Sequence, residues 1–389
     1  MKIGHYNLGI WQQGGIASYI RRVSEVQRAL GHEVVFFDAS PSAAAPEAGW
    51  EVRGVRTDRE LFTAASDLRL DVLHLHTAVA EVPADNRRMA VVRTVHVHEP
   101  YCPSATQFLF RSNAPCSHGY QPLRCLHGYL FEHCGSLRPA NLVHSLTRFR
   151  HERRTLPAIR TLAISEFLKR RLIEAGYPEQ RIAVLRPMAP AGVDYVPPPA
   201  GEVPRFLFAG RLVPQKGLQW LFRALQRVRV PCRLDVAGDG YARERLQREA
   251  ENLHLQDRVR FHGWLQRDAL DSLFRSARAV VFPSLWQEPA GLVPLEAMAH
   301  GRAVIASRVG GACEPIDDGS DGLVVEPGDV DRLAAALERL AGEFDLARRL
   351  GIEGRRKALE NFSISSHVAQ LHRHYAGGPM PDEQAACRQ

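Results

Sequence analysis

The chain has 389 residues, of which 45% are hydrophobic and 24% charged, an ordinary composition for a globular protein of two domains. There is no run of about 18 apolar residues, and the N-terminus lacks a charged stretch followed by an apolar core. We therefore expect neither membrane-spanning helices nor a secretion signal, and predict a cytoplasmic protein. The net charge is +7, and residues 138–186 alone hold eleven Arg or Lys against four Glu.

Short β-branched runs alternate with longer amphipathic stretches in the first half of the chain, a pattern typical of a parallel sheet with crossover helices. Helices are predicted between the strands, for example over Ile16–Leu30 and Glu166–Ala175. Six strands are predicted, over Lys2–Tyr6, Glu33–Phe37, Val72–His76, Val91–Val97, Thr161–Ile164 and Ile182–Leu185.

The second half repeats the pattern. Its predicted strands are Arg205–Phe208, Arg233–Ala237, Val259–Phe261, Ala279–Phe282, Val304–Ala306 and Leu323–Val325. Its predicted helices are Leu218–Val228, Tyr241–Asn252, Leu270–Ser276, Val293–His300 and Asp331–Leu340. The fold class is therefore α/β, with two doubly wound, Rossmann-like domains facing a central cleft.

Proline marks the joint between the halves. Six prolines crowd the stretch from Pro187 to Pro204, which suits an extended linker better than a helix or a central strand. We predict an N-terminal domain over 1–187, a linker over 188–204 and a C-terminal domain over 205–362. Residues 363–389 are expected to form a helix that crosses back to the first domain, followed by a frayed tail.

Ligands of open parallel sheets bind beyond the carboxyl ends of the strands. The loop after the first strand of the second half runs from Gly210 to Gly217 and contains Arg211 and Lys216, two cations suited to a diphosphate. Gly238 follows the next strand and forms another close backbone turn. Each loop by itself is also compatible with a solvated surface turn.

Residues 283–301 carry the strongest signal. Glu288 lies in a loop after a predicted strand, and a helix is expected to begin near Gly291. The free N–H groups of Gly291, Leu292 and Val293 would form an anion site at the helix N-terminus. Glu296 follows eight residues after Glu288, about 12 Å if the span were helical. Two carboxylates on either side of a phosphate site match the shape of a nucleotide sugar.

This Glu-x7-Glu segment, with Gly210-Arg211 and Lys216-Gly217, resembles glycosyltransferase family 4, and the resemblance extends through nearly the whole chain. It implies a retaining enzyme of the two-domain GT-B architecture that uses a UDP- or GDP-linked sugar, of the type that builds polysaccharides. By this likeness Arg211 and Lys216 hold the diphosphate, Glu296 the ribose and Glu288 the donor sugar. Gly14-Gly15 resembles the N-terminal glycine loop of the family.

The same resemblance assigns His98 to the transferred sugar, as a catalytic residue beside Glu288, Arg211 and Lys216. Strand alternation would place His96 and His98 on one face, with His98 nearer the ligand end. The chain departs from the family pattern at Glu99, where Asp is usual, and at Ala290, where Phe is common. The second departure predicts a larger donor pocket without naming a sugar.

Four cysteines lie close together in the sequence: Cys102, Cys116, Cys125 and Cys134. Together they match a tetrahedral zinc site, but they lack paired Cys-x-x-Cys spacing. A structural zinc and a set of reduced thiols both remain open.

Retention without an evident carboxylate nucleophile predicts front-face attack, with fixed cations stabilising the leaving diphosphate. No Asp-x-Asp motif occurs in these loops, so no metal cofactor is expected for catalysis. The alternatives are a nucleotide-sugar epimerase of the same fold and a non-catalytic nucleotide-sugar-binding protein. A dinucleotide-dependent oxidoreductase is disfavoured, because no Gly-x-Gly-x-x-Gly opens either half.

The basic stretch indicates an anionic partner or a solvated helix face. Polyprenyl-linked acceptors reside at membranes, so we predict a saccharide or lipid-linked acceptor and peripheral contact with the inner face of the cytoplasmic membrane. Nucleic acid is not expected, because aromatic residues are not interleaved among the basic ones. The cations in question are Arg148, Arg150, Arg153, Arg154, Lys169, Arg170 and Arg171.

Overall fold

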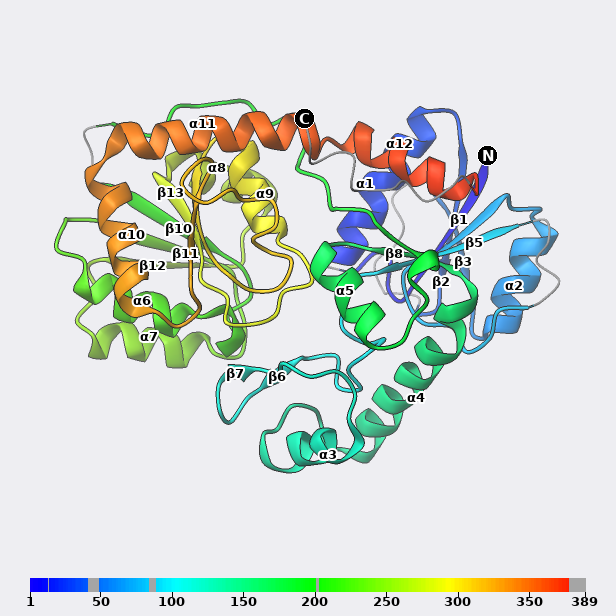
Figure 1. Ribbon diagram of the computed structural model, residues 1–389. Coiled ribbons are helices and arrows are strands. Elements are labelled where there is room, and N and C mark those ends of the chain that lie inside the picture. The colour runs from blue at the N-terminus through cyan, green and yellow to red at the C-terminus, as the bar shows by residue number, and fades with distance from the viewer. Residues whose placement is uncertain (13, 41–48, 84–88, 201–202, 378–389) are drawn as a thin grey trace.

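Two parallel β-sheets dominate the computed structural model, which describes residues 1–12, 14–40, 49–83, 89–200 and 203–377 (Figure 1). The first sheet has seven strands in the order β3-β2-β1-β4-β5-β8-β9, all paired in parallel. The strands are β1 Lys2–Asn7, β2 Glu33–Asp38, β3 Glu51–Gly54, β4 Val72–Leu75, β5 Ala90–Val95, β8 Arg160–Ala163 and β9 Ile182–Val184. The near-continuous burial of β1, β2 and β4 fits a sheet covered by helices on both faces.

Helices α1 (Gly15–Ala29), α2 (Asp58–Asp67) and α5 (Glu166–Glu174) connect strands of this sheet. Helix α1 buries Ile20 and Val23 in the same core as residues of β1 and β2, which is the expected use of an amphipathic crossover helix.

The second sheet has six parallel strands in the order β12-β11-β10-β13-β14-β15. They are β10 Arg205–Ala209, β11 Arg233–Ala237, β12 Val259–Gly263, β13 Ala279–Phe282, β14 Ala303–Ser307 and β15 Leu323–Val325. The helices between and after them are α6 Leu218–Arg227, α7 Arg243–Asn252, α8 Arg267–Ser276, α9 Leu292–Ala299 and α10 Val330–Gly342. The predicted α/β class with two doubly wound, Rossmann-like domains is therefore confirmed.

The chain passes from one sheet to the other through a stretch whose described residues form no helix or strand. It returns at its end: helix α11 (Phe344–Asn361) lies along the second domain, and α12 (Ile364–Tyr375) lies over the first (Figure 1). Helix α12 packs on α1 and buries Val368 and Leu371 in the first core. The Tyr375 hydroxyl also lies 2.7 Å from His74 Nδ1, which ties the last helix to β4.

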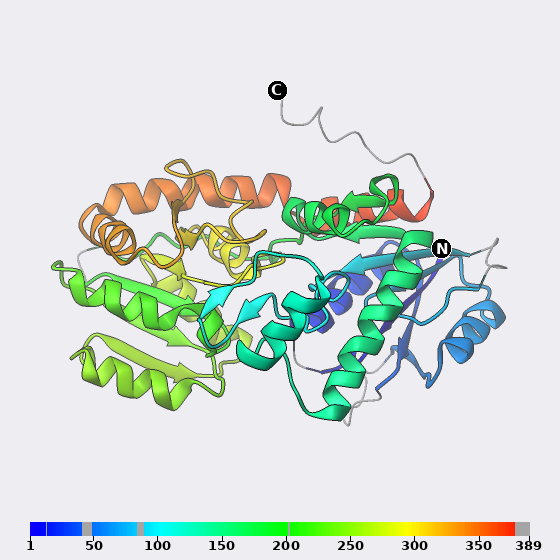
Figure 2. The ribbon, with the colours of Figure 1, turned by 60° about the horizontal axis from the view of Figure 1, so that its bottom comes forward.

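A long insertion between β5 and β8 stands out from the first domain. It contains the short hairpin β6 (Phe108–Leu109) and β7 (Ala114–Pro115), and the helices α3 (Pro122–Phe131) and α4 (Pro139–Thr155). Figure 1 shows α3 and the start of α4 projecting below the sheets, and Figure 2, turned to bring that side forward, shows them in front of the rest of the chain. Helix α4 is anchored at its other end by a buried ion pair, with 2.6 Å between Arg93 Nη2 and Glu152 Oε1.

One predicted strand was too long. The strand expected over Val91–Val97 ends at Val95, so His96 and His98 lie in the turn beyond it and the alternation argument for their shared face is wrong. The chain bends there because the loop leaves the sheet towards the inserted hairpin. Helices were expected between the strands, but no ranges were predicted for α2, α3 and α4, and the edge strand β3 was not anticipated.

Candidate functional site

Each sheet has a point where the chain reverses its strand order, between β1 and β4 in the first and between β10 and β13 in the second. Crevices for ligands form at such points, beyond the carboxyl ends of the strands. The two crevices face each other across the domain boundary, because a Cβ placed on Gly15 would lie only 3.5 Å from Leu292 Cδ1. Helices α1 and α9 thus bring their N-termini together from opposite domains.

Neither of these N-termini is capped by a side chain, and neither first turn contains an acidic residue. The N-cap positions are Gly14 and Gly291, so the first backbone N–H groups of both helices lack side-chain acceptors at the domain boundary. The backbone at Gly291 is closely packed, since a Cβ there would lie 3.0 Å from Ala312 O. This arrangement favours an anion between the domains.

A cavity of about 510 Å³ opens beside the two helix ends. Helix α1 contributes Ser18 and Arg22 to its lining, and the second domain contributes Trp264, Arg267 and Glu296. A second cavity, of about 250 Å³, shares Trp264 with the first and is lined by the loops after β10 and β11. The two cavities together form a groove along the carboxyl edge of the second sheet.

Glu296 lies in this groove among opposing charges. Desolvation raises its pKa above the usual range, while the guanidinium groups of Arg22 and Arg267 act against the rise and Asp271 adds to it. Two cations from different domains therefore face one carboxylate. Glu296 was predicted from its motif, whereas Arg22, Arg267 and Trp264 belong to no recognisable motif and were not.

The predicted phosphate loops lie along the second cavity. Gly210, Arg211 and Gly238 all line it. Gly238 has φ 136°, and a Cβ there would lie 1.9 Å from Gly210 O, so the two loops are packed backbone to backbone. The Arg211 guanidinium is exposed and has no ion-pair partner among the described residues, which leaves it free for a ligand.

Lys216 and Glu288 meet directly. Lys216 Nζ lies 2.7 Å from Glu288 Oε1, and the Ser284 hydroxyl donates to the same oxygen at 2.6 Å. The backbone of Gly310 packs closely against the Glu288 loop, because a Cβ on Gly310 would lie 2.1 Å from Glu288 O. Gly310 was missed in the sequence, although a Gly-Gly pair after a predicted strand was a usable signal.

His98 is completely buried. Its Nδ1 bonds to the Tyr101 hydroxyl, and its ring meets Trp286 edge-on with 5.1 Å between centroids. Desolvation lowers its pKa to about 3, so the imidazole is neutral at pH 7. His98 is therefore shielded from solvent in this structure, and one of the rings that pack against it is Trp286, which lies two residues before Glu288.

Unlike His98, His96 is partly exposed, and its ring stacks on that of His76 with 5.3 Å between ring centroids. It ends a buried chain of hydrogen bonds from Gln27 through His5 and His76. If Gln27 accepts from His5 Nε2–H, then His76 must donate to His5, and His96 to His76. Neutral tautomers thus satisfy the chain.

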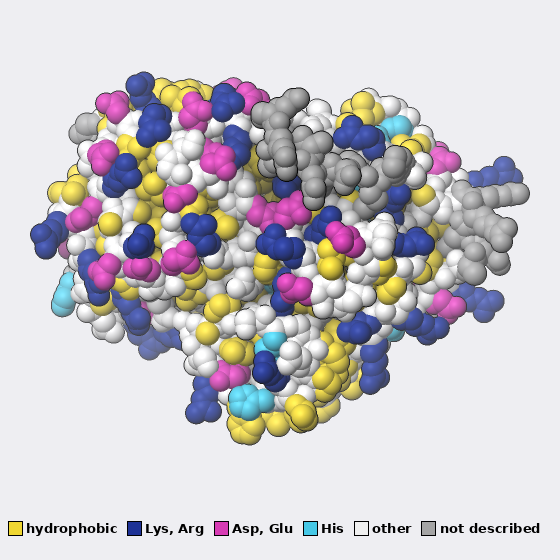
Figure 3. Space-filling view, viewed as in Figure 1, with side chains coloured by type: hydrophobic (Ala, Val, Ile, Leu, Met, Phe, Trp, Pro, Cys, Tyr) yellow, Lys and Arg dark blue, Asp and Glu magenta, His cyan; other side chains and the backbone are white. Residues whose placement is uncertain are grey.

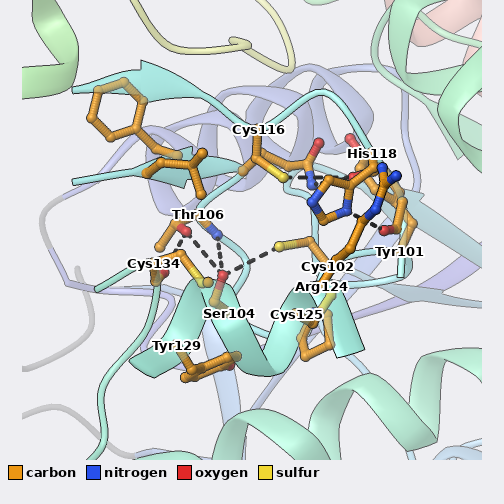
Figure 4. Close-up of a pocket in the computed structure, with 16 residues that line it drawn as sticks. Tyr101, Cys102, Ser104, Thr106, Cys116, His118, Arg124, Cys125, Tyr129 and Cys134 are labelled. Carbon is orange, nitrogen blue, oxygen red and sulfur yellow. Dashed lines mark hydrogen bonds between the residues drawn. The ribbon is translucent and has the colours of Figure 1, made fainter. Parts of the chain in front are cut away.

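His5, His74 and His76 are also the only group of three or more potential metal ligands that lie close together in the described part of the chain. Ring nitrogens of all three already have hydrogen-bond partners. The four clustered cysteines do not form such a group, although all of them line one cavity of about 30 Å³ (Figure 4). All four are free thiols, so a structural zinc and a set of reduced thiols remain the two interpretations.

A second contact joins the domains where the sequence had no motif. The Glu314 carboxylate accepts hydrogen bonds from the backbone N–H groups of Glu166, at 2.9 Å, and Phe167, at 2.6 Å. These N–H groups open helix α5 of the first domain, so a side chain of the second domain caps that helix. The Trp286 indole N–H also donates to Thr106 O of the first domain.

Some of the cations in the basic stretch of residues 138–186 are bound to other side chains of the protein. Arg148 bonds to Glu99 and Thr77, each at 2.8 Å. Arg171 bonds to Glu174 at 2.7 Å and to Gln107 at 3.2 Å, whereas Arg150, Arg153 and Arg154 are exposed. No helix in the described ranges combines the length and apolar character needed to cross a membrane.

Two family models match the chain: Glycosyltransferase Family 4 over residues 13–190, and Glycosyl transferases group 1 over residues 196–357. An uncharacterized glycosyltransferase of Methanocaldococcus jannaschii is 35% identical over 159 residues, 40% of this chain and 40% of the relative. A GDP-mannose-dependent alpha-(1-6)-phosphatidylinositol monomannoside mannosyltransferase of Mycolicibacterium smegmatis is 36% identical over 180 residues, 44% of this chain and 47% of the relative. Each match spans less than half of the relative's length.

Among solved structures, Anabaena HepE in complex with UDP-glucose superposes with a TM-score of 0.71 at 17% identity, over 97% of this chain and all of that one (100%). The two facing domains and the groove between them define the class of GT-B glycosyltransferases. Within that class, the chain belongs to glycosyltransferase family 4.

Proposed function

We propose that the protein transfers a sugar, with retention of configuration, from a nucleotide-sugar donor to a saccharide or lipid-linked acceptor. The observation that carries this proposal is the meeting of two uncapped helix N-termini, α1 at Gly15 and α9 at Leu292, beside a groove that Glu296 lines. A diphosphate between the helix ends would receive backbone N–H groups from both domains.

The groove supports separate roles for its side chains. Arg211 is free to bind the diphosphate, and Lys216 has donors beyond the one it gives to Glu288. Glu296 would bind the ribose hydroxyls, and the exposed indole of Trp264, between the two cavities, offers a face for the base. Glu288 would bind donor sugar hydroxyls. We propose a UDP- or GDP-linked donor.

The proposed reaction proceeds by front-face attack. The acceptor oxygen bonds to the anomeric carbon as the bond to the diphosphate breaks, and the departing phosphate oxygen takes the acceptor proton. Arg211, Lys216 and the α9 N–H groups stabilise the charge that grows on the diphosphate. Contacts between the domains, at Trp286 and Glu314, favour a closed cleft that excludes water.

The alternatives are a nucleotide-sugar epimerase and a non-catalytic binding protein. A test begins with thermal stabilisation of the protein by a panel of UDP- and GDP-sugars, followed by NMR of the product formed with a saccharide acceptor. We expect one donor to stabilise the protein and the product to keep the donor's anomeric configuration. A product of inverted anomeric configuration would refute the retaining mechanism. Isomerisation of the donor in an incubation without acceptor would support the epimerase.

The matched variants are Arg211→Ala and Arg227→Ala. Arg211 faces the groove, whereas Arg227 is an exposed arginine paired with Asp331 on the far side of the second domain's core. Only Arg211→Ala should weaken donor stabilisation, by about tenfold in affinity. Equal donor affinity in both variants contradicts the assignment.

A further inference from the structure

The outer face of helix α3 is apolar and uncovered. Leu123, Leu126 and Leu130 recur at intervals of three and four residues, which places them on one side of the helix. Leu123 is 83% exposed and Leu126 56%. The residues of α3 that are buried, Gly128 and Tyr129, face the cysteine-lined cavity instead. This helix therefore turns its leucines away from the protein, the reverse of an ordinary surface helix.

The patch continues past the end of α3. Phe131 and Leu137, and Val143 on the first turns of α4, are also exposed. Figure 3 shows yellow side chains gathered at the lower edge of the molecule, where Figure 1 places α3 and the start of α4. Scattered exposed leucines are ordinary, but a contiguous set at the tip of a projection marks an interaction surface. We call Leu123, Leu126, Leu130, Phe131, Leu137 and Val143 the apolar tip.

The charges around the tip are almost all positive. Arg124 lies on α3 between tip residues, and Arg138 directly precedes α4. Arg150, Arg153 and Arg154 are also exposed, but they lie farther along α4, near its anchored end. The carboxylates in the same region are Glu132, which bonds to Ser112, and Glu152, which is buried against Arg93. An apolar face bordered by free arginines complements an anionic lipid surface, where leucines enter the acyl boundary and guanidiniums meet headgroups.

We propose that the apolar tip is the membrane-docking surface of the protein and that its partner is a bilayer containing anionic lipid. This inference rests on the proposed function in one respect, because a docked tip would hold the cleft beside a lipid-linked acceptor. It also changes the surface expected from the sequence: contact is made by the leucines of α3 and the arginines around them, and not by Arg148 or Arg171, which are engaged within the protein.

The test compares two double variants of the full chain. Leu123→Asp/Leu126→Asp places carboxylates in the tip, and Leu30→Asp/Leu359→Asp makes the same change at exposed leucines elsewhere, at 60% and 48% exposure. Both pairs are exposed, so both proteins should fold, which circular dichroism and thermal unfolding check. Binding is measured by cosedimentation with vesicles of phosphatidylcholine alone and of phosphatidylcholine mixed with phosphatidylglycerol.

We expect the unmodified protein and the Leu30→Asp/Leu359→Asp variant to bind the mixed vesicles, less strongly at high salt. The tip variant should bind them at least about tenfold more weakly. Equal binding of both variants, or no binding by the unmodified protein, overturns the proposal. Self-association that the tip variant abolishes, without vesicle binding, would instead assign the surface to a second copy of the chain.

Donor hydrolysis in solution, without vesicles, separates this inference from the proposed function. Loss of vesicle binding with hydrolysis intact is the result expected of the tip variant. An unmodified protein that hydrolyses donor but binds no vesicles refutes the docking surface alone. One that binds vesicles but neither binds nor hydrolyses any nucleotide sugar refutes the proposed function alone.

Discussion

Lys216 and Glu288, 72 residues apart in the chain, form a nearly buried ion pair with 2.7 Å between Nζ and Oε1. The residue expected to bind the diphosphate thus also holds the residue expected to bind the sugar. Because the Ser284 hydroxyl donates to the same carboxylate oxygen, Glu288 is oriented before any donor arrives. Preorganisation of this kind lowers the cost of binding in the reactive geometry.

The first prediction concerns this ion pair. Lys216→Met leaves a buried carboxylate without its cation and should lower the free energy of unfolding by about 3 kcal/mol. The double variant Lys216→Met/Glu288→Gln should lose less than the two single variants together, because no unpaired charge remains. Urea denaturation measures the free energy of unfolding of the two single variants and the double variant.

The control is Arg227→Met, which breaks an exposed pair with Asp331 and should change the free energy of unfolding by no more than about 1 kcal/mol. Strictly additive effects at Lys216 and Glu288 would contradict the coupling.

The second prediction concerns His98, which we regard as a positioning residue for the Glu288 loop. His98→Ala removes the ring that packs on Trp286 and should lower kcat by about 100-fold. Affinity for the free nucleoside diphosphate should stay within about twofold, because Arg211 and the α9 terminus are untouched. His98→Gln, which keeps an N–H donor, should recover part of the loss. Unchanged turnover in His98→Ala would refute the role.

The third prediction concerns Glu314. Glu314→Ala removes the cap that the second domain provides to helix α5, so the domains should separate more readily. We expect a larger radius of gyration in small-angle X-ray scattering and a kcat lower by about tenfold. Glu326→Ala is the matched control, since Glu326 forms an exposed pair with Arg308. The same scattering curve for both variants would rule out a closing role.

The fourth prediction is a loss of stability in mild acid. Burial lowers the pKa of His5 and His367 to about 4, and that of His96 to about 3, against about 6.5 in the unfolded chain. Between these values the unfolded chain binds more protons, so stability is complete above pH 6.5 and falls as the pH drops towards 4. Each histidine contributes up to about 1.4 kcal/mol per pH unit.

Urea denaturation at pH 7.5, 6.0 and 5.0 would measure this dependence. His5→Gln should flatten the slope by about one proton, whereas His127→Gln, at an exposed position of α3, should leave it unchanged. A stability independent of pH over this range would mean that the buried histidines are not neutral in the folded protein.

The fifth prediction concerns the four cysteines around the cavity of Figure 4. Since they do not form a compact ligand set, we expect protein purified without a His tag to contain less than about half an equivalent of zinc. Thiol titration after denaturation should then find all seven cysteines of the chain reduced. A full equivalent of zinc, lost in Cys116→Ser, would show that the thiols close on a metal.

The sequence identified the family and the order of its parts because these depend on local chain chemistry. Alternating strand and helix periods predicted two doubly wound domains, and glycines before Arg211 and around Glu288 marked backbone turns at strand ends. Helix α9 begins at Leu292, one residue from the predicted start. The functions assigned to these residues remain predictions that the variants above address.

Other features depend on residues that are distant in the chain, so only the tertiary structure decided them. The approach of Gly15 to Leu292 and the placement of Arg22 and Arg267 around Glu296 arise from domain packing. The burial of His98 under Trp286 arises in the same way. The exposure of the leucine face of α3 was likewise undetermined. Apolar periodicity predicts that one side of a helix is hydrophobic, but it does not show whether the protein buries that side.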